Sequence, residues 1–187
     1  SLIGGFDFNR NKFNHVTQAW RQPGSSFKPF IYSGALEKGF TPASIVQDDP
    51  ISFPASVTGS RAWEPKNYDG KYEGAMRLRT ALAKSKNMVS IRLLQASGVQ
   101  FIQDYATRFG FDADKHPAYL TMALGAGSVT PWQMVAGYSV FANGGYRIQP
   151  YIVRDIRDAN GSILAESKPV TAGDQSLLVI DPRNAFL

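Results

Sequence analysis

Ser25 and Ser26 stand just ahead of Lys28, behind a Pro-Gly pair, in the stretch RQPGSSFKPF (21–30). If a helix begins at Ser25, the Ser25 hydroxyl and the Lys28 amine lie on one face, because three residues are close to one helical turn. A serine is a useful nucleophile only beside a base, and a lysine can be that base when burial or another cation lowers its pKa. The free N–H groups of a helix start could stabilise an oxyanion. The spacing permits serine catalysis, but a Ser-x-x-Lys arises by chance about once in such a chain, and Pro-Gly-Ser-Ser is also an ordinary turn and cap.

A second polar motif, Ser85-x-Asn87, follows about sixty residues later in ALAKSKNMVSIRLL (81–94). It falls at a predicted helix break, where side chains can project from a turn, although Ser and Asn can also merely interrupt a helix. The order of the two motifs is the stronger signal. Ser-x-x-Lys and Ser-x-Asn, completed by Lys-Thr-Gly, are the signature of penicillin-binding proteins and class A β-lactamases.

The first motif is predicted to open a helix. The N-terminal region has two apolar runs, SLIGGFDF (1–8) and NKFNHVTQAW (11–20), around a polar NRN, and this predicts a β-hairpin whose first strand begins at the first residue. From Ser25 to Gly39 the apolar residues recur at helical spacing. Residues 40–74 are rich in Pro, Gly, Asp and Ser and predict a long irregular connection with a few short strands, which in a compact domain favours a functional loop.

The rest of the chain is predicted to alternate helices with one hairpin. Thr130, followed by Pro131 and by Gln133, carries the signals of an N-cap, and Asn-Gly-Gly ends that helix. The other predicted elements are one or two helices over 74–98 broken around Ser85, a helix over 99–110, and a hairpin over 146–167 turning at 159–161. Helices and hairpins in this order predict an α+β fold with an antiparallel sheet.

Composition narrows the class of protein. The 187 residues are 43% hydrophobic and can form one globular core, and the net charge of +5 is spread among acidic residues instead of forming a nucleic-acid footprint. The chain has no cysteine, and its two histidines, His15 and His116, lie about a hundred residues apart, so both are expected to be ordinary polar positions and not a metal site. No run approaches the roughly 20 apolar residues of a membrane span. We expect no cofactor, no metal and no nucleic-acid partner.

Taken together, the motifs resemble the transpeptidase domain of class A, bifunctional penicillin-binding proteins. The resemblance is carried by GGFDF, FNHVTQAWRQPGSSFKP, PKNYDGKYEGAMRLRTALAKSKN, VTPWQMVAGYSVFANGG and DPRNAF, which cover most of the chain in the family's order. It implies an antiparallel sheet flanked by helices, with a helical subdomain, as in serine β-lactamases and penicillin-binding transpeptidases. It also implies a parent protein anchored in the bacterial inner membrane and facing the periplasm.

The resemblance assigns a role to each motif residue. Ser25 would attack the carbonyl between the last two D-alanines of a peptidoglycan stem peptide and form an acyl-enzyme, which an amine of a neighbouring stem peptide resolves into a cross-link. β-Lactam antibiotics would acylate the same serine. Lys28 would be the general base, Ser85 a proton relay to the leaving nitrogen, and Asn87 a hydrogen-bond partner of Lys28 and of the substrate amide. The Ser25 N–H would supply half of the oxyanion hole.

The third motif of the family is not in this sequence, which contains no Lys-Thr-Gly and no Lys-Ser-Gly. In the family that motif lies on a strand beyond the DPRNAF-like segment. We therefore expect residues 1–187 to be a partial transpeptidase domain, incomplete on its C-terminal side and without the glycosyltransferase domain or membrane anchor. The remainder of the same domain would complete it, and the fragment alone would be inactive or weakly active.

Two other functions stay open. A serine β-lactamase would need a carboxylate that activates the deacylating water, in a Glu-x-x-x-Asn context after Asn87, and no acidic residue there has that context. A non-catalytic module that binds peptidoglycan or a partner protein is the second alternative, and the four residues Ser25, Lys28, Ser85 and Asn87 argue against it for the parent protein.

Overall fold

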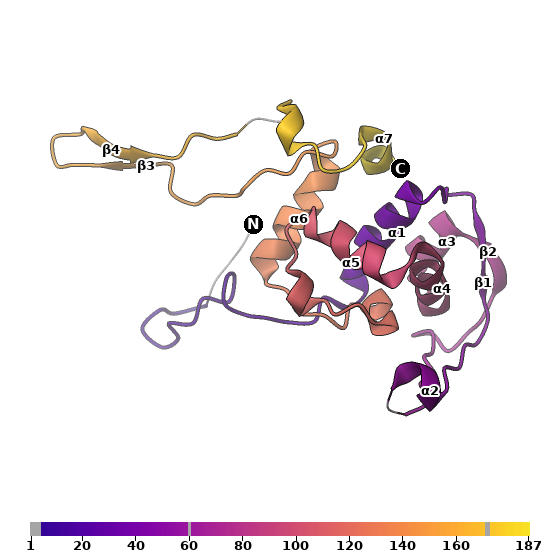
Figure 1. Cartoon of the computed structure of the whole chain (residues 1–187). Helices are drawn as coiled ribbons and strands as arrows, with labels where there is room; N and C mark the ends of the chain where they lie inside the picture. The colour runs from indigo at the N-terminus through magenta and orange to yellow at the C-terminus, as the bar shows by residue number, and fades with distance from the viewer. Residues whose placement is uncertain (1–4, 60, 171–172) are drawn as a thin grey trace.

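The computed structural model describes residues 5–59, 61–170 and 173–187, and it shows a helical body from which a two-stranded hairpin projects (Figure 1). At the centre of the body is helix α1 (Lys28–Glu37), which continues the 3-10 turn η1 (Gly24–Phe27). Helices α4 (Asn87–Ser97), α5 (Val99–Thr107) and α7 (Pro182–Phe186) pack against α1. The other helical segments are α2 (Ala55–Thr58), α3 (Leu78–Ala83), η2 (Ala113–Lys115), η3 (Leu120–Leu124), α6 (Pro131–Ala142) and η4 (Gln175–Leu177).

The first turns of the central helix are anchored by aromatic packing. Phe27, Phe30 and Ile31 are completely buried. The Phe30 ring meets Phe109 and Phe111 edge-on, with ring centroids 5.0 and 4.7 Å apart. Each such side chain contributes about 1.5–3 kcal/mol through burial, so the segment that carries the Ser-x-x-Lys motif is held firmly by the core.

The predicted helix break around Ser85 is confirmed, and its geometry is that of a Schellman motif. Ser85 has φ +54°, and its N–H donates to the Leu82 carbonyl while the Lys86 N–H donates to the Ala81 carbonyl, both at 2.9 Å. This left-handed position is usually glycine, and a serine there costs about 1–2 kcal/mol. The chain therefore bends sharply between α3 and α4 and presents Ser85 at the bend.

The α+β prediction is confirmed, with two separate antiparallel pairs in the described part of the chain. Strand β1 (Ile45–Asp48) pairs with β2 (Gly74–Arg77), which closes the predicted irregular connection at both ends. Strands β3 (Asp155–Arg157) and β4 (Ile163–Glu166) form the projecting hairpin, turning through Gly161 at φ +84° as predicted.

The predicted N-terminal hairpin is wrong for residues 5–20, which contain turns and no strand, while residues 1–4 lie outside the described part. Polar side chains take the backbone donors that a ladder would need. Asp7 Oδ1 accepts the Asn9 N–H at 2.9 Å, and Asn14 Oδ1 accepts the Val16 N–H at 3.0 Å. Such local Asx turns compete with strand pairing, and the segment pairs only further on, in an isolated bridge between Arg21 and Val129.

Two further expectations have opposite outcomes. Helix α6 begins with the predicted capping box, in which the Gln133 N–H donates to Thr130 Oγ1 and the Gln133 side chain accepts the Thr130 N–H. His116 is not an ordinary polar position, because it is only 1% exposed and its ring stacks on Phe27 with centroids 4.6 Å apart. Burial lowers its pKa below the usual value, an effect that Asp112 partly opposes.

Candidate active site

Ser25 lies in η1, one turn before the Lys28 side chain. The predicted α-helical start at Ser25 is corrected to a 3-10 turn beginning at Gly24, in which the Ser25 carbonyl accepts the Lys28 N–H. Side chains three residues apart eclipse one another in a 3-10 turn, so Ser25 and Lys28 still share a side. The Ser25 side chain is exposed, and among the described residues no hydrogen bond joins its hydroxyl to the Lys28 amine.

The turn carrying Ser25 is fixed from outside by a glycine-to-glycine backbone contact. Gly125, which ends η3, has φ +66°, and its carbonyl accepts the Gly24 N–H at 3.3 Å. A Cβ on Gly125 would lie 2.6 Å from the Gly24 nitrogen, so this position has no room for a side chain, whereas a Cβ on Gly24 would meet no atom within 4 Å. The position of Ser25 therefore depends on η3 as well as on α1.

Lys28 brings the two sequence motifs together. Its side chain is 1% exposed, and its Nζ donates to Asn87 Oδ1 at 2.7 Å, to the Ser85 carbonyl at 2.6 Å and to Ser85 Oγ at 3.1 Å. Three of the four predicted residues are thus in direct contact although they are almost sixty positions apart in the chain. The close approach follows from the packing of α1 on α4.

Burial lowers the pKa of Lys28 to about 8. At neutral pH about one amine in ten is then deprotonated, against about one in several thousand for an unperturbed lysine. A neutral amine keeps two N–H donors and gains a lone pair, so one of its three contacts must give way. Ser85 Oγ, the longest of the three, can instead donate to that lone pair, which gives the cluster a path for proton exchange.

The Asn87 amide is oriented at both ends. Its Oδ1 accepts from Lys28, while its Nδ2 donates to the Lys66 carbonyl at 2.8 Å. The second N–H of this amide is left for a ligand. The Asn87 backbone N–H donates to Asn67 Oδ1 at 2.8 Å, so Asn67 from the irregular connection acts as a cap for α4.

Sequence reasoning did not single out Asn67, whose side chain accepts the Asn87 N–H, or Lys86, the residue between Ser85 and Asn87. The segment PKNYDGKYEG contributes to the family resemblance, but no motif assigns a role to its side chains. The available signal was charge: Asp69, Lys71 and Glu73 alternate in sign within a turn-rich stretch that directly precedes the second motif. No cluster of acidic residues and histidines that could hold a metal ion occurs in residues 5–59, 61–170 and 173–187.

Comparison with known proteins shows the family of the chain. A family model described as the penicillin-binding protein transpeptidase domain matches residues 2–184. The chain therefore belongs to the penicillin-binding protein transpeptidase family, and the resemblance inferred from the motifs is confirmed.

Within that family the chain is most usefully compared with penicillin-binding proteins 1A. It is 50% identical over its full length to the protein of that name from Neisseria flavescens, and 48% identical over 90% of its length to the one from Pseudomonas aeruginosa. It spans 23% and 20% of those proteins, so it corresponds to less than a quarter of either.

Solved structures give the same result for the fold. Penicillin-binding protein 1A from Haemophilus influenzae matches 99% of the chain with a TM-score of 0.91 and 41% identity, and the match covers 31% of that protein's chain. PonA1 from Mycobacterium tuberculosis matches 94% of the chain with a TM-score of 0.79 and 26% identity. In the part that the structure describes, no helix is long and apolar enough to cross a membrane.

Proposed function

We propose that this chain carries the acylation centre of a D,D-transpeptidase that cross-links peptidoglycan stem peptides, with Ser25 as the nucleophile. The observation that supports it most is the contact of the buried Lys28 amine with Ser85 and Asn87, at 2.6 to 3.1 Å. Membership of the family and the likeness to penicillin-binding proteins 1A support the same reaction class.

In the proposed reaction the neutral Lys28 amine takes the Ser25 proton as Ser25 Oγ attacks the carbonyl of the penultimate D-alanine. The backbone N–H of Ser25, at the start of a helical turn, stabilises the oxyanion. Ser85 passes the proton from Lys28 to the nitrogen of the departing D-alanine, and the free N–H of the Asn87 amide binds the substrate amide carbonyl. The acyl group on Ser25 then moves to an amine of a second stem peptide, which loses a proton to Lys28, and Lys28 returns this proton to Ser25 Oγ as the ester bond breaks.

β-Lactams are proposed to form the same ester with Ser25, because their strained amide presents an equivalent carbonyl. A penicillin-binding protein A of M. tuberculosis with the same fold has been solved as an imipenem acyl-enzyme complex, which supports this expectation for the fold. The remainder of the domain, including the Lys-Thr-Gly strand and its second cation, is proposed to lie in the parent protein beyond this chain. The parent is proposed to be anchored in the inner membrane with this domain in the periplasm.

Labelling of the full-length parent protein with a fluorescent penicillin tests the nucleophile. Ser25→Ala is expected to abolish covalent labelling, whereas Ser26→Ala, which removes the neighbouring hydroxyl from the same turn, is expected to retain it. Mass spectrometry of the labelled peptide should place the adduct on Ser25. Labelling that survives in Ser25→Ala contradicts the proposal, and an unlabelled parent protein would favour a non-catalytic binding module.

A further inference from the structure

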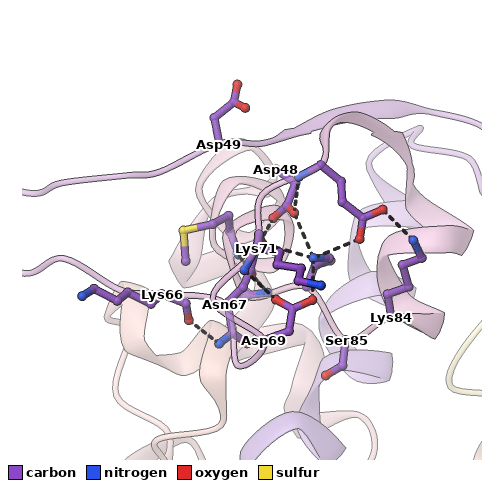
Figure 2. A network of polar contacts seen from close by, with 12 residues as sticks. Asp48, Asp49, Lys66, Asn67, Asp69, Lys71, Lys84 and Ser85 are labelled. Carbon is purple, nitrogen blue, oxygen red and sulfur yellow. Dashed lines mark hydrogen bonds and ion pairs between the residues drawn. The ribbon is translucent and has the colours of Figure 1, made fainter.

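Lys86, the middle residue of the Ser85–Asn87 motif, is buried in a cluster of carboxylates. Its side chain is 2% exposed, and its Nζ lies 3.0 Å from Asp69, 3.1 Å from Glu73 and 3.4 Å from Asp48. It also donates to the Lys71 carbonyl at 3.2 Å. Figure 2 shows Asp48, Asn67 and Asp69 close together in one network of polar contacts, in which Asn67 donates to Asp48.

The charge of Lys86 is secure even though the residue is buried. Desolvation alone would lower its pKa, but the hydrogen bonds to Asp69 and Glu73 and the charge of Asp48 raise the pKa above its usual value. Asp48 is completely buried and depends on this cation together with donors from Asn67 and from the Glu73 backbone. A buried ion pair is a weak source of stability compared with apolar packing, and its best-attested use is to fix a particular arrangement.

The arrangement that it fixes is the loop of residues 66–73 against the start of α4. Asn67 lies at the centre of the contact: its Nδ2 donates to Asp48 Oδ1 at 2.7 Å and to the Lys71 carbonyl at 2.8 Å. Its Oδ1 accepts the N–H groups of Asn87 at 2.8 Å and Met88 at 3.3 Å. These are donors that a helix start leaves unpaired, and α4 has no cap from its own N-cap residue, Lys86.

The same loop sets the direction of the Asn87 amide. The Lys66 carbonyl, next to Asn67, accepts from Asn87 Nδ2 at 2.8 Å. An amide held in this way must turn its oxygen to the other side, toward the Lys28 amine. In the reverse orientation the Asn87 N–H groups would face the donors of Lys28, and the Asn87 oxygen would face the Lys66 carbonyl. A loose loop would no longer hold the Lys66 carbonyl in place, and the Asn87 amide would lose its preferred orientation.

We propose that Lys86, together with Asp48 and Asn67, is a positioning unit that holds the Asn87 amide in the orientation needed to bind Lys28 and substrate. The inference rests on the proposed acylation function of Ser25, Lys28 and Asn87. Lys86 itself touches none of the reacting atoms. It acts through the 66–73 loop, and Asn67 and the Lys66 carbonyl are the groups that transmit the effect to Asn87.

The test compares Lys86→Met with Lys84→Met in the full-length parent protein. Both changes remove one positive charge beside Ser85, but Lys84 is half-exposed and, within the described part of the chain, forms its ion pair with Glu73 alone, at 2.5 Å. Stopped-flow acylation by a fluorescent penicillin separates the dissociation constant of the first complex from the rate constant of acylation. Lys86→Met is expected to lower the acylation rate constant by about tenfold or more, since misplacement of catalytic groups costs rate steeply, and Lys84→Met to change it less than about twofold.

A second comparison separates positioning from a general loss of structure. If Lys86 acts through Asn87, then Lys86→Met added to Asn87→Ala should slow acylation no further, because coupled residues are not additive. Additive losses in this pair would overturn the proposal. Wild-type acylation in Lys86→Met would overturn it too.

Lys86→Met leaves the Asp48 carboxylate buried without its cation, and this variant can fail to fold. Asp48→Asn/Lys86→Met removes both buried charges and keeps an acceptor for Asn67, so this double variant is expected to fold while Asp69 and Glu73 lose their contact with residue 86. Slow acylation in this folded double variant supports the proposal, and wild-type acylation overturns it. The outcome is independent of the nucleophile test: loss of labelling in Ser25→Ala with normal rates in the Lys86 variants would retain the function and reject only the positioning unit.

Discussion

Replacement of Gly125 by alanine should slow the acylation of Ser25, although Ser25 itself is unchanged. A Cβ on Gly125 would lie 2.6 Å from the Gly24 nitrogen and 2.7 Å from its carbonyl carbon, and still nearer to its carbonyl oxygen. Ordinary contacts of a Cβ begin at 3.4 Å, so the two backbones must separate by about 1 Å to restore van der Waals distance. Both partners are backbone, and neither can rotate out of the way.

The displaced segment is the turn that carries Ser25, directly after Gly24. A shift of about 1 Å in a reacting group can cost about a hundredfold in rate, so the second-order rate constant for acylation by a fluorescent penicillin should fall to that extent in Gly125→Ala of the parent protein. Stability should fall as well, by about 1–2 kcal/mol for the left-handed backbone and about 1–3 kcal/mol for the overpacked contact.

Gly144→Ala is the matched control. Gly144 has φ +67°, almost the same as +66° at Gly125, but a Cβ there would meet no atom within 4 Å. It should show the cost of the left-handed backbone alone, about 1–2 kcal/mol, with acylation at the wild-type rate. If folded Gly125→Ala protein, checked by its thermal transition, is acylated as fast as Gly144→Ala, then the contact with Gly24 does not position Ser25 and the reasoning is refuted.

Two further predictions concern titration. The acylation rate should rise with pH as Lys28 loses its proton, by about tenfold from pH 6 to 7, and level off above the Lys28 pKa of about 8. Stopped-flow acylation rates measured across this pH range check the prediction. A flat profile from about pH 6 to 9 would exclude Lys28 as the base. Burial lowers the pKa of His116 in the folded protein, so as the pH falls His116 is protonated in the unfolded state before it is protonated in the folded state. The free energy of unfolding should therefore decrease as the pH drops below about 6.5, by at most about 1.4 kcal/mol per pH unit. Thermal melts at neutral and mildly acidic pH should show a smaller loss for His116→Leu than for wild type, and equal losses would contradict this account.

The candidate site was largely predictable because its residues carry local signals. The spacing of Ser25 and Lys28 determines a shared side in either kind of helical turn, and the break at Ser85 follows from polar residues inside an apolar helical pattern. The contact between Lys28 and Asn87 could not be derived from spacing alone, since it depends on how α1 packs against α4. The lowered pKa of Lys28 depends on the same packing, because its cause is burial.

The errors have specific physical causes. The apolar alternation near the N-terminus predicted strands, but side chains such as Asp7 and Asn14 accept nearby backbone N–H groups in local turns that compete with strand pairing. His116 was expected to be an ordinary polar residue because a sequence does not reveal that Phe27 will stack on it. Lys86 was overlooked for a related reason: a lysine within a basic stretch is normally solvated, and only three carboxylates brought from the preceding connection and strand make its burial tolerable.

The cap on α4 has a consequence for exchanging parts between related proteins. Asn67, twenty residues upstream, supplies the acceptor for the Asn87 N–H. The Ser-Lys-Asn tripeptide alone therefore does not determine how Asn87 is oriented. A chimera that receives the tripeptide but keeps a foreign connection would contain every motif residue and still react slowly. If the proposed function holds, two homologues with identical motifs can therefore differ in acylation rate through the residues of this loop.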